Sequence, residues 1–107
     1  MTEAEILTMR PNYARLDAVA APEFKREIDA QVGESNRLVL LDLSDVQFMD
    51  STGLGVLVSL LKRLGNGGRI AVIGAAPPVT KLFQITRLDT LFTICASEQE
   101  ARDALGA

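Results

Sequence analysis

Four consecutive residues, Asp50-Ser51-Thr52-Gly53, carry the side chains best placed to take part in chemistry in this chain. They follow a short apolar segment and precede a run of leucines and valines, which is a usual position for a helix N-terminus. Side-chain oxygens of Asp, Ser and Thr accept hydrogen bonds from the free N–H groups of the first helical turn. By themselves the four residues therefore indicate a helix cap, and a catalytic role would need further partners.

No residue elsewhere in the sequence completes an enzyme site around this loop. The chain has no histidine and a single cysteine, Cys95, which excludes Ser-His and Cys-His pairs as well as a zinc site. An aspartate that accepts a phosphoryl group also needs an acidic pair after the first strand to hold Mg²⁺. The residues that follow the first expected strand here are Met9-Arg10-Pro11, which include no acidic residue. The glycine turn at 65–68 lacks the Lys-Ser/Thr of a phosphate-binding loop. We therefore expect a protein that is not an enzyme and that uses no cofactor and no metal.

The composition is that of a small globular protein. The 107 residues are 48% apolar and carry a net charge of −3, which suits one domain, expected over residues 1–107. The 11 basic residues are scattered, which argues against nucleic-acid binding. No apolar run approaches the roughly 18 residues needed to cross a bilayer, and the start Met1-Thr2-Glu3-Ala4-Glu5 is acidic. We expect a cytoplasmic protein without membrane insertion, with Cys95 buried in the apolar run 91–95.

Strand and helix patterns alternate along the chain. The expected segments are strands at 5–9, 13–16, 38–43, 46–49, 69–74 and 90–95, and helices that start near 22, 53, 77 and 97. Two of the strands are continuous apolar runs, which are typical of strands covered on both faces. Prolines near two helix starts and an S-x-x-E capping box at 97–100 support the helices. The alternation predicts an α/β domain with a partly parallel sheet.

The helix expected over 53–64 has two apolar faces. Its core-facing residues fall within about 80° of Leu54 when each residue turns the helix by roughly 100°. Val56 and Leu60 fall on the opposite face, beside Ser59 and Arg63. In a domain of two layers Val56 and Leu60 would be exposed, and exposed apolar residues rimmed by polar ones suggest a surface that binds a partner. The alternative is that another helix or loop covers them.

The segment Phe48-Met49-Asp50-Ser51-Thr52-Gly53-Leu54-Gly55-Val56-Leu57 closely resembles the signature of the STAS domain family, named after sulfate transporters and anti-sigma factor antagonists. The chain is most similar to the free-standing anti-sigma factor antagonists, and the similarity covers about Leu7 to Leu105. The resemblance implies a single STAS domain, an α/β fold with a mixed sheet of four to five strands and helices mainly on one side.

The resemblance also implies a partner-switching role. In the family, the serine after the motif aspartate, here Ser51, is phosphorylated by an anti-sigma factor that is also a serine kinase. The unphosphorylated chain would bind this kinase, phosphorylation would end the binding, and a serine phosphatase would reset it. Asp50 would present Ser51, Thr52 would cap the helix, and Gly53 and Gly55 would let a partner's backbone come close. A phosphate suits a helix N-terminus but opposes burial against a partner docked on that helix.

Two positions depart from the family pattern. The segment before Asp17 is short, so the N-terminal hairpin of the family is expected to be reduced or to lack its first strand. Arg87 stands at the end of the third predicted helix, where relatives often carry a glycine. A left-handed backbone conformation at that position would be less favourable for arginine than for glycine.

Two other functions are compatible with the same fold. The chain could be the STAS subunit of an ABC-type lipid transport system that docks to its ATPase without phosphorylation. It could also be a scaffold domain of a large signalling complex. A docking surface on the helix after Asp50 would serve all three functions.

Overall fold

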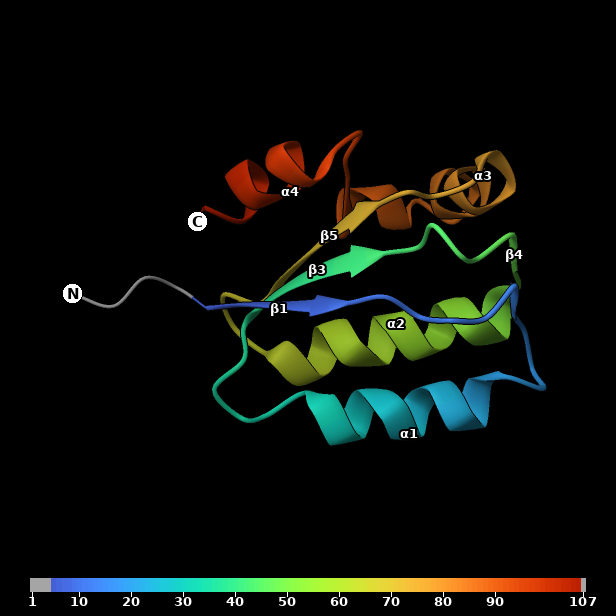
Figure 1. Ribbon diagram of the computed structural model, residues 1–107, viewed down its shortest axis with the longest axis horizontal. Coiled ribbons are helices and arrows are strands. Elements are labelled where there is room, and N and C mark those ends of the chain that lie inside the picture. The colour runs from blue at the N-terminus through green and yellow to red at the C-terminus, as the bar shows by residue number, and fades with distance from the viewer. Residues whose placement is uncertain (1–4, 107) are drawn as a thin grey trace.

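The computed structural model describes residues 5–106 (Figure 1), so the acidic start of the chain at residues 1–4 lies outside it. Its helices are α1 (Ala21–Gln31), α2 (Ser51–Leu64), α3 (Pro77–Ile85) and α4 (Glu98–Leu105), with a short 3₁₀ helix η1 (Leu88–Thr90). Its strands are β1 (Ile6–Met9), β2 (Arg15–Leu16), β3 (Leu38–Asp42), β4 (Phe48–Met49), β5 (Arg69–Ile73) and β6 (Thr93–Ile94). The expected α/β order is confirmed.

Four strands form the main sheet in the order β1-β3-β5-β6, and β2 pairs with β4 in a small second sheet. In the central pair Val39 lies opposite Ile70 and Leu41 opposite Val72. Within residues 5–106 the strands pair only in parallel, where a mixed sheet was expected. The cause is the connections: a parallel neighbour needs a crossover, and α1, α2 and α3 provide one between successive strands of the main sheet.

Side chains alternate across the main sheet and build an apolar core on each face. Val39 and Leu41 belong to the larger core, which α1 and α2 cover, while Leu40 and Ala71 pack with Leu105 of α4. Figure 1 shows α1 and α2 on one side of the strands and α4 on the other. Both faces of the central strands are apolar, so both need a covering helix.

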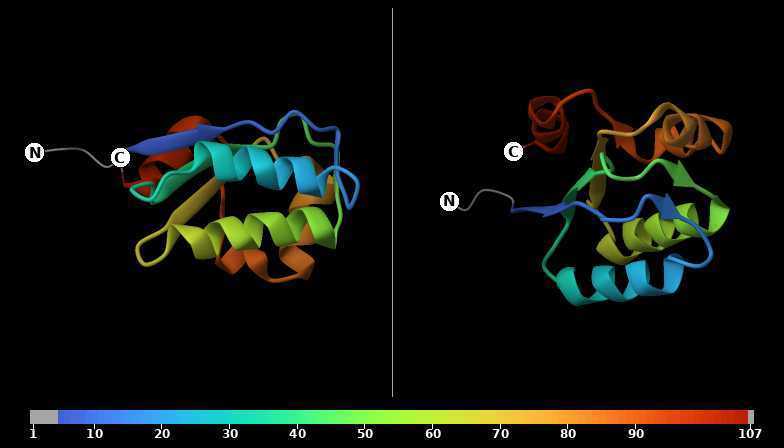
Figure 2. Two further views of the ribbon diagram at one scale, coloured as in Figure 1. Left: turned by 90° about the horizontal axis from the view of Figure 1, so that it is seen from below. Right: turned by 45° about the vertical axis from the view of Figure 1, so that its right-hand side comes forward.

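The N-termini of α1 and α2 lie at the end of the molecule to which the strands of the main sheet point. The left view of Figure 2 shows the two helices side by side and running in the same direction. The segment with β2 and the segment with β4 meet at this end (Figure 1). The parallel crossovers therefore bring the motif loop, at the start of α2, next to the segment that leads into α1.

The C-terminal part of the chain follows its sequence signals with one difference. The Ser97 hydroxyl oxygen accepts a hydrogen bond from the Glu100 N–H at 3.1 Å, as the capping box predicts. Cys95 is buried, as predicted, and burial raises the pKa of its thiol. The strand expected at 90–95 is shorter, because residues 88–90 turn into η1 and only Thr93–Ile94 pair with β5.

Candidate functional site

Asp50 is the cap of α2. Its Oδ1 accepts hydrogen bonds from the N–H groups of Thr52 at 2.9 Å and Gly53 at 3.1 Å. The backbone of Asp50 is extended, which is the usual conformation of a residue that caps a helix N-terminus. The expectation that Thr52 caps the helix is therefore wrong, because Thr52 donates to the cap. The helix starts at Ser51, two residues before the expected Gly53.

Ser51 is the first residue of α2 and is exposed to solvent. Because Asp50 accepts the two N–H bonds, the Ser51 side chain stays outside the cap. A negative charge added at this position would meet the positive end of the helix dipole. The site can therefore take a phosphate with little disturbance of the helix.

Gly53 is buried against the chain's own backbone. A Cβ at this position would overlap the carbonyl oxygen of Leu16 and would lie 2.9 Å from its carbonyl carbon. The same Leu16 oxygen accepts a hydrogen bond from the Asp50 N–H at 3.2 Å. Gly53 thus lets α2 approach β2, and the expected role in receiving a partner's backbone is not available to it. Gly55 is exposed with open space around it, so that role stays a prediction for Gly55 alone.

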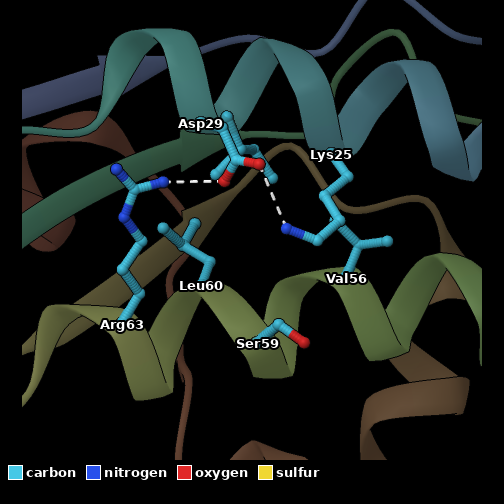
Figure 3. Close-up of a pocket in the computed structure, with 7 residues that line it drawn as sticks. Lys25, Asp29, Val56, Ser59, Leu60 and Arg63 are labelled. Atoms are coloured by element: carbon cyan, nitrogen blue, oxygen red, sulfur yellow. Dashed lines mark hydrogen bonds and ion pairs between the residues drawn. The ribbon is translucent and has the colours of Figure 1, made fainter.

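The face of α2 that carries Val56 and Leu60 packs against α1. Leu60 is only 1% exposed, and Val56 is half-buried against the same core. The expectation that both residues are exposed is therefore wrong, and the alternative of a covering helix is correct. Val56 and Leu60 line a groove of about 120 Å³ between the two helices (Figure 3), and Ile28 of α1 also lines it.

Charged side chains close this groove from both helices. The Arg63 Nη1 donates to Asp29 Oδ1 at 2.7 Å, and its Nη2 donates to the carbonyl oxygen of Val32 at 2.7 Å. Lys25 donates to the other Asp29 oxygen at 3.1 Å (Figure 3). Arg63 therefore joins α2 to α1, which is a structural role. Ser59 is exposed at the mouth of the groove, and partner binding by Ser59 stays a prediction.

An exposed set of residues beside the motif loop was not foreseen from the sequence. The Arg15 guanidinium lies 4.2 Å from the centre of the Phe48 ring, and its Nε lies 3.5 Å from Asp17 Oδ2. Phe48 and Val19 are exposed apolar side chains at this end of the molecule. The signal that could have pointed to them is the Arg15-Leu16-Asp17 segment, whose role depends on the pairing of β2 with β4.

Asp17 accepts hydrogen bonds from the N–H groups of Ala20 and Val19, both at 3.1 Å. The bond from Ala20, followed by the bond from Val19 and the nearby Arg15, holds the pKa of the Asp17 carboxyl below its ordinary value. These bonds satisfy N–H groups at the entry to α1, as Asp50 does for α2. The two aspartates thus organise the two helix starts at this end of the fold.

Arg87 lies in the left-handed conformation that was expected to be unfavourable for an arginine. Its backbone is left-handed, with φ at 61°, directly after the C-terminus of α3. This is the one positive φ of a non-glycine residue in the described part of the chain. The turn after α3 is therefore left-handed at an arginine, and a glycine in relatives at this position stays a prediction.

Within residues 5–106 no group of three or more potential metal ligands comes together. In the same range no helix is both long and apolar enough to span a bilayer.

The fold and the motif loop match a known family. Residues 3–101 match the STAS domain, and the chain belongs to this family. It is 32% identical over 80 residues to the anti-sigma-B factor antagonist of Staphylococcus aureus, which covers 74% of each chain. It is 33% identical over 86 residues to the anti-sigma-B factor antagonist of Listeria monocytogenes, covering 79% of this chain and 75% of that one. The crystal structure of an anti-sigma factor antagonist from Mycobacterium paratuberculosis matches with a TM-score of 0.84 and 25% identity, over 100% of this chain and 91% of that chain.

Proposed function

We propose that this chain is an anti-sigma factor antagonist that binds a cognate anti-sigma factor with serine kinase activity, and that phosphorylation of Ser51 ends this binding. The names of the two bacterial relatives support the role of anti-sigma factor antagonist. The observation that carries the second part is the placement of Ser51, exposed at the start of α2 and outside the cap made by Asp50. In this role the chain acts in the cytoplasm by binding, without a cofactor of its own.

The chemistry is divided between the chain and its partners. This chain supplies the Ser51 hydroxyl, and the kinase supplies ATP, Mg²⁺ and a base that takes the hydroxyl proton. The γ-phosphoryl group moves to the Ser51 oxygen, and ADP leaves. A serine phosphatase then hydrolyses the phosphoester, which returns the hydroxyl and releases inorganic phosphate.

The physical basis of the switch is a difference between the free chain and the complex. The phosphate adds about −1.5 to −2 charges at neutral pH. In the free chain these charges lie in water at a helix N-terminus, where they are favourable. In the complex the same charges would have to lose their water against the kinase surface. Phosphorylation therefore weakens binding while the fold is preserved.

The direct test uses the purified chain with the anti-sigma factor kinase of its host and ATP. We expect the wild type and Ser59→Ala to take up one phosphate and Ser51→Ala to take up none. Ser59→Ala is a matched control because Ser59 is an exposed serine on the same helix. Ser51→Asp should bind the kinase at least about tenfold more weakly, or about 1.4 kcal/mol, with an unchanged midpoint of thermal unfolding. Phosphorylation of Ser51→Ala, or wild-type affinity of Ser51→Asp, would refute the proposal.

A further inference from the structure

Arg15 is a largely exposed cation beside the motif loop. Its side chain is 62% exposed, stacks on Phe48 and pairs with Asp17 across 3.5 Å. Exposed ion pairs of this kind hold their partners weakly, and a cation–π contact at an exposed site is similarly weak. The guanidinium can therefore exchange its present carboxylate for a stronger anion without disturbing the core.

The pairing of β2 with β4 brings Arg15 close to Ser51. The two strands are parallel, with Arg15 opposite Phe48 and Leu16 opposite Met49. Neighbouring strands lie about 4.8 Å apart, and the three residues from Phe48 to Ser51 span at most about 10 Å. An extended arginine and a phosphoserine side chain together bridge such a separation.

The Arg15 side chain also leans in the required direction. Its ion pair is with Asp17, which follows β2, so the guanidinium lies toward the carboxyl end of that strand. Since β4 is parallel to β2, the carboxyl end of β4 lies at the same end, and Ser51 starts α2 there. The hydrogen bond from the Asp50 N–H to the Leu16 carbonyl oxygen holds the two segments together at this point.

We propose that Arg15 is the counter-ion of phosphorylated Ser51 within the same chain. This deepens the proposed function and rests on Ser51 being the residue that is phosphorylated. A phosphoserine offers three acceptor oxygens and nearly two charges, against one charge on the Asp17 carboxylate. The planar guanidinium donates two parallel hydrogen bonds to a phosphate, which a lysine does not. Arg15 therefore moves from Asp17 to the phosphate when Ser51 is modified.

This exchange changes more of the surface than the phosphate alone. Asp17 loses its cation and keeps the N–H bonds of the α1 start. The Phe48 ring loses the guanidinium that lies over it. A partner that contacts this end of the molecule would then meet an altered surface at Phe48 and Asp17 as well as a new charge at Ser51.

The test measures the second pKa of a phosphate at position 51 by ³¹P NMR. Phosphoserine is installed there during translation, so that no kinase is needed. The charged groups on the elements that meet at this end are Arg15, the carboxylates of Asp17 and Asp50, the N-terminus of α2, and Lys81 of α3, the helix that packs on β4. Only Arg15 changes between the variants, so the difference between them reports its contribution.

We expect Arg15→Ala to raise the phosphate pKa by about 0.7 pH unit, the shift expected for loss of a charge about 4 Å away in water. Arg15→Lys should give a smaller rise, and the shifts should shrink at high salt. The matched control is Arg102→Ala on α4, a partly exposed arginine in an ion pair with Glu98 on the other face of the sheet. It should leave the phosphate pKa unchanged.

A second readout is the Nε–H signal of Arg15, which should shift when position 51 carries phosphate, while that of Arg102 should not. Equal phosphate pKa values in the wild type and Arg15→Ala would overturn the proposal. An Arg15 Nε–H signal that does not shift when position 51 carries phosphate would overturn it as well. Because the phosphoserine is installed during translation, the outcome of this NMR test does not depend on the kinase. An unphosphorylated Ser51 in the kinase assay would instead refute the proposed function.

Discussion

Replacing Gly53 by alanine tests the close contact on which the motif loop depends. The new Cβ would overlap the carbonyl oxygen of Leu16 and lie 3.0 Å from the Leu16 Cβ. These are backbone atoms and the first side-chain atom, so no flexible side chain can move aside. The helix must shift away from β2, and with it the Asp50 N–H that donates to the same oxygen.

Gly55 offers a matched control on the same helix. No heavy atom lies within 4 Å of a Cβ built there. Gly55→Ala should therefore show the ordinary gain of alanine over glycine in a helix, about 0.5–1 kcal/mol. In Gly53→Ala the same gain is outweighed by overpacking, which costs about 1–3 kcal/mol or more where the backbone must move.

The two variants should thus differ in sign. Urea unfolding followed by far-UV circular dichroism suits a chain without tryptophan. We expect Gly55→Ala to raise the free energy of unfolding and Gly53→Ala to lower it. Because the gain of alanine over glycine is common to both, the two variants should differ by the overpacking cost, about 1–3 kcal/mol, which corresponds to roughly 4–8 °C in the unfolding midpoint for each kcal/mol. Equal stabilities would show that α2 does not need Gly53 to approach β2, and would refute this account of the loop.

Three further substitutions test other parts of the structure. Arg87→Gly should raise the free energy of unfolding by roughly 0.5–1 kcal/mol, because glycine adopts the left-handed conformation without strain. A lower midpoint of thermal unfolding in Arg87→Gly than in the wild type would contradict this. Leu60→Ala should cost about 2–5 kcal/mol in urea unfolding, as for a buried leucine, whereas a cost below about 0.5 kcal/mol would place Leu60 in solvent. Asp17→Ala should destabilise the chain at neutral pH, because the pKa of Asp17 is lower in the folded chain than in the unfolded chain. The stabilisation that the Asp17 carboxylate gives is present above its ordinary pKa of about 3.9 and is lost as pH falls through its lowered pKa in the folded chain. A difference between wild type and Asp17→Ala that does not narrow on acidification would contradict that assignment.

The features that could be predicted from the sequence are those with a local signal. The apolar runs correctly predicted the strands β3 and β5, and the capping box correctly predicted the start of α4. The left-handed turn at Arg87 was expected from the resemblance to the family and not from a local signal. The motif at 48–57 identified the family directly, because its loop and helix start lie in one continuous segment.

The errors at Leu60 and Gly53 concern contacts between segments far apart in the chain. Leu60 was expected to be exposed because α2 was considered against the sheet alone, whereas Ile28 of α1 belongs to the same core as Leu60. Two helices that cross over the same face of a parallel sheet lie next to each other, and their remaining apolar faces pack together. The contact of Gly53 could not be predicted for the same reason. Its close neighbour Leu16 belongs to β2, which is far from α2 in the sequence, and no local pattern indicates that the two segments approach each other.

The most direct test of the central claim is mass spectrometry of this protein from its native cells under two growth conditions. Intact mass gives the number of phosphates, and peptide fragmentation assigns the position. We predict one phosphate on Ser51, with an occupancy that changes between the two conditions. Protein that is unmodified in both conditions and copurifies with the ATPase of a membrane transporter would contradict the switch.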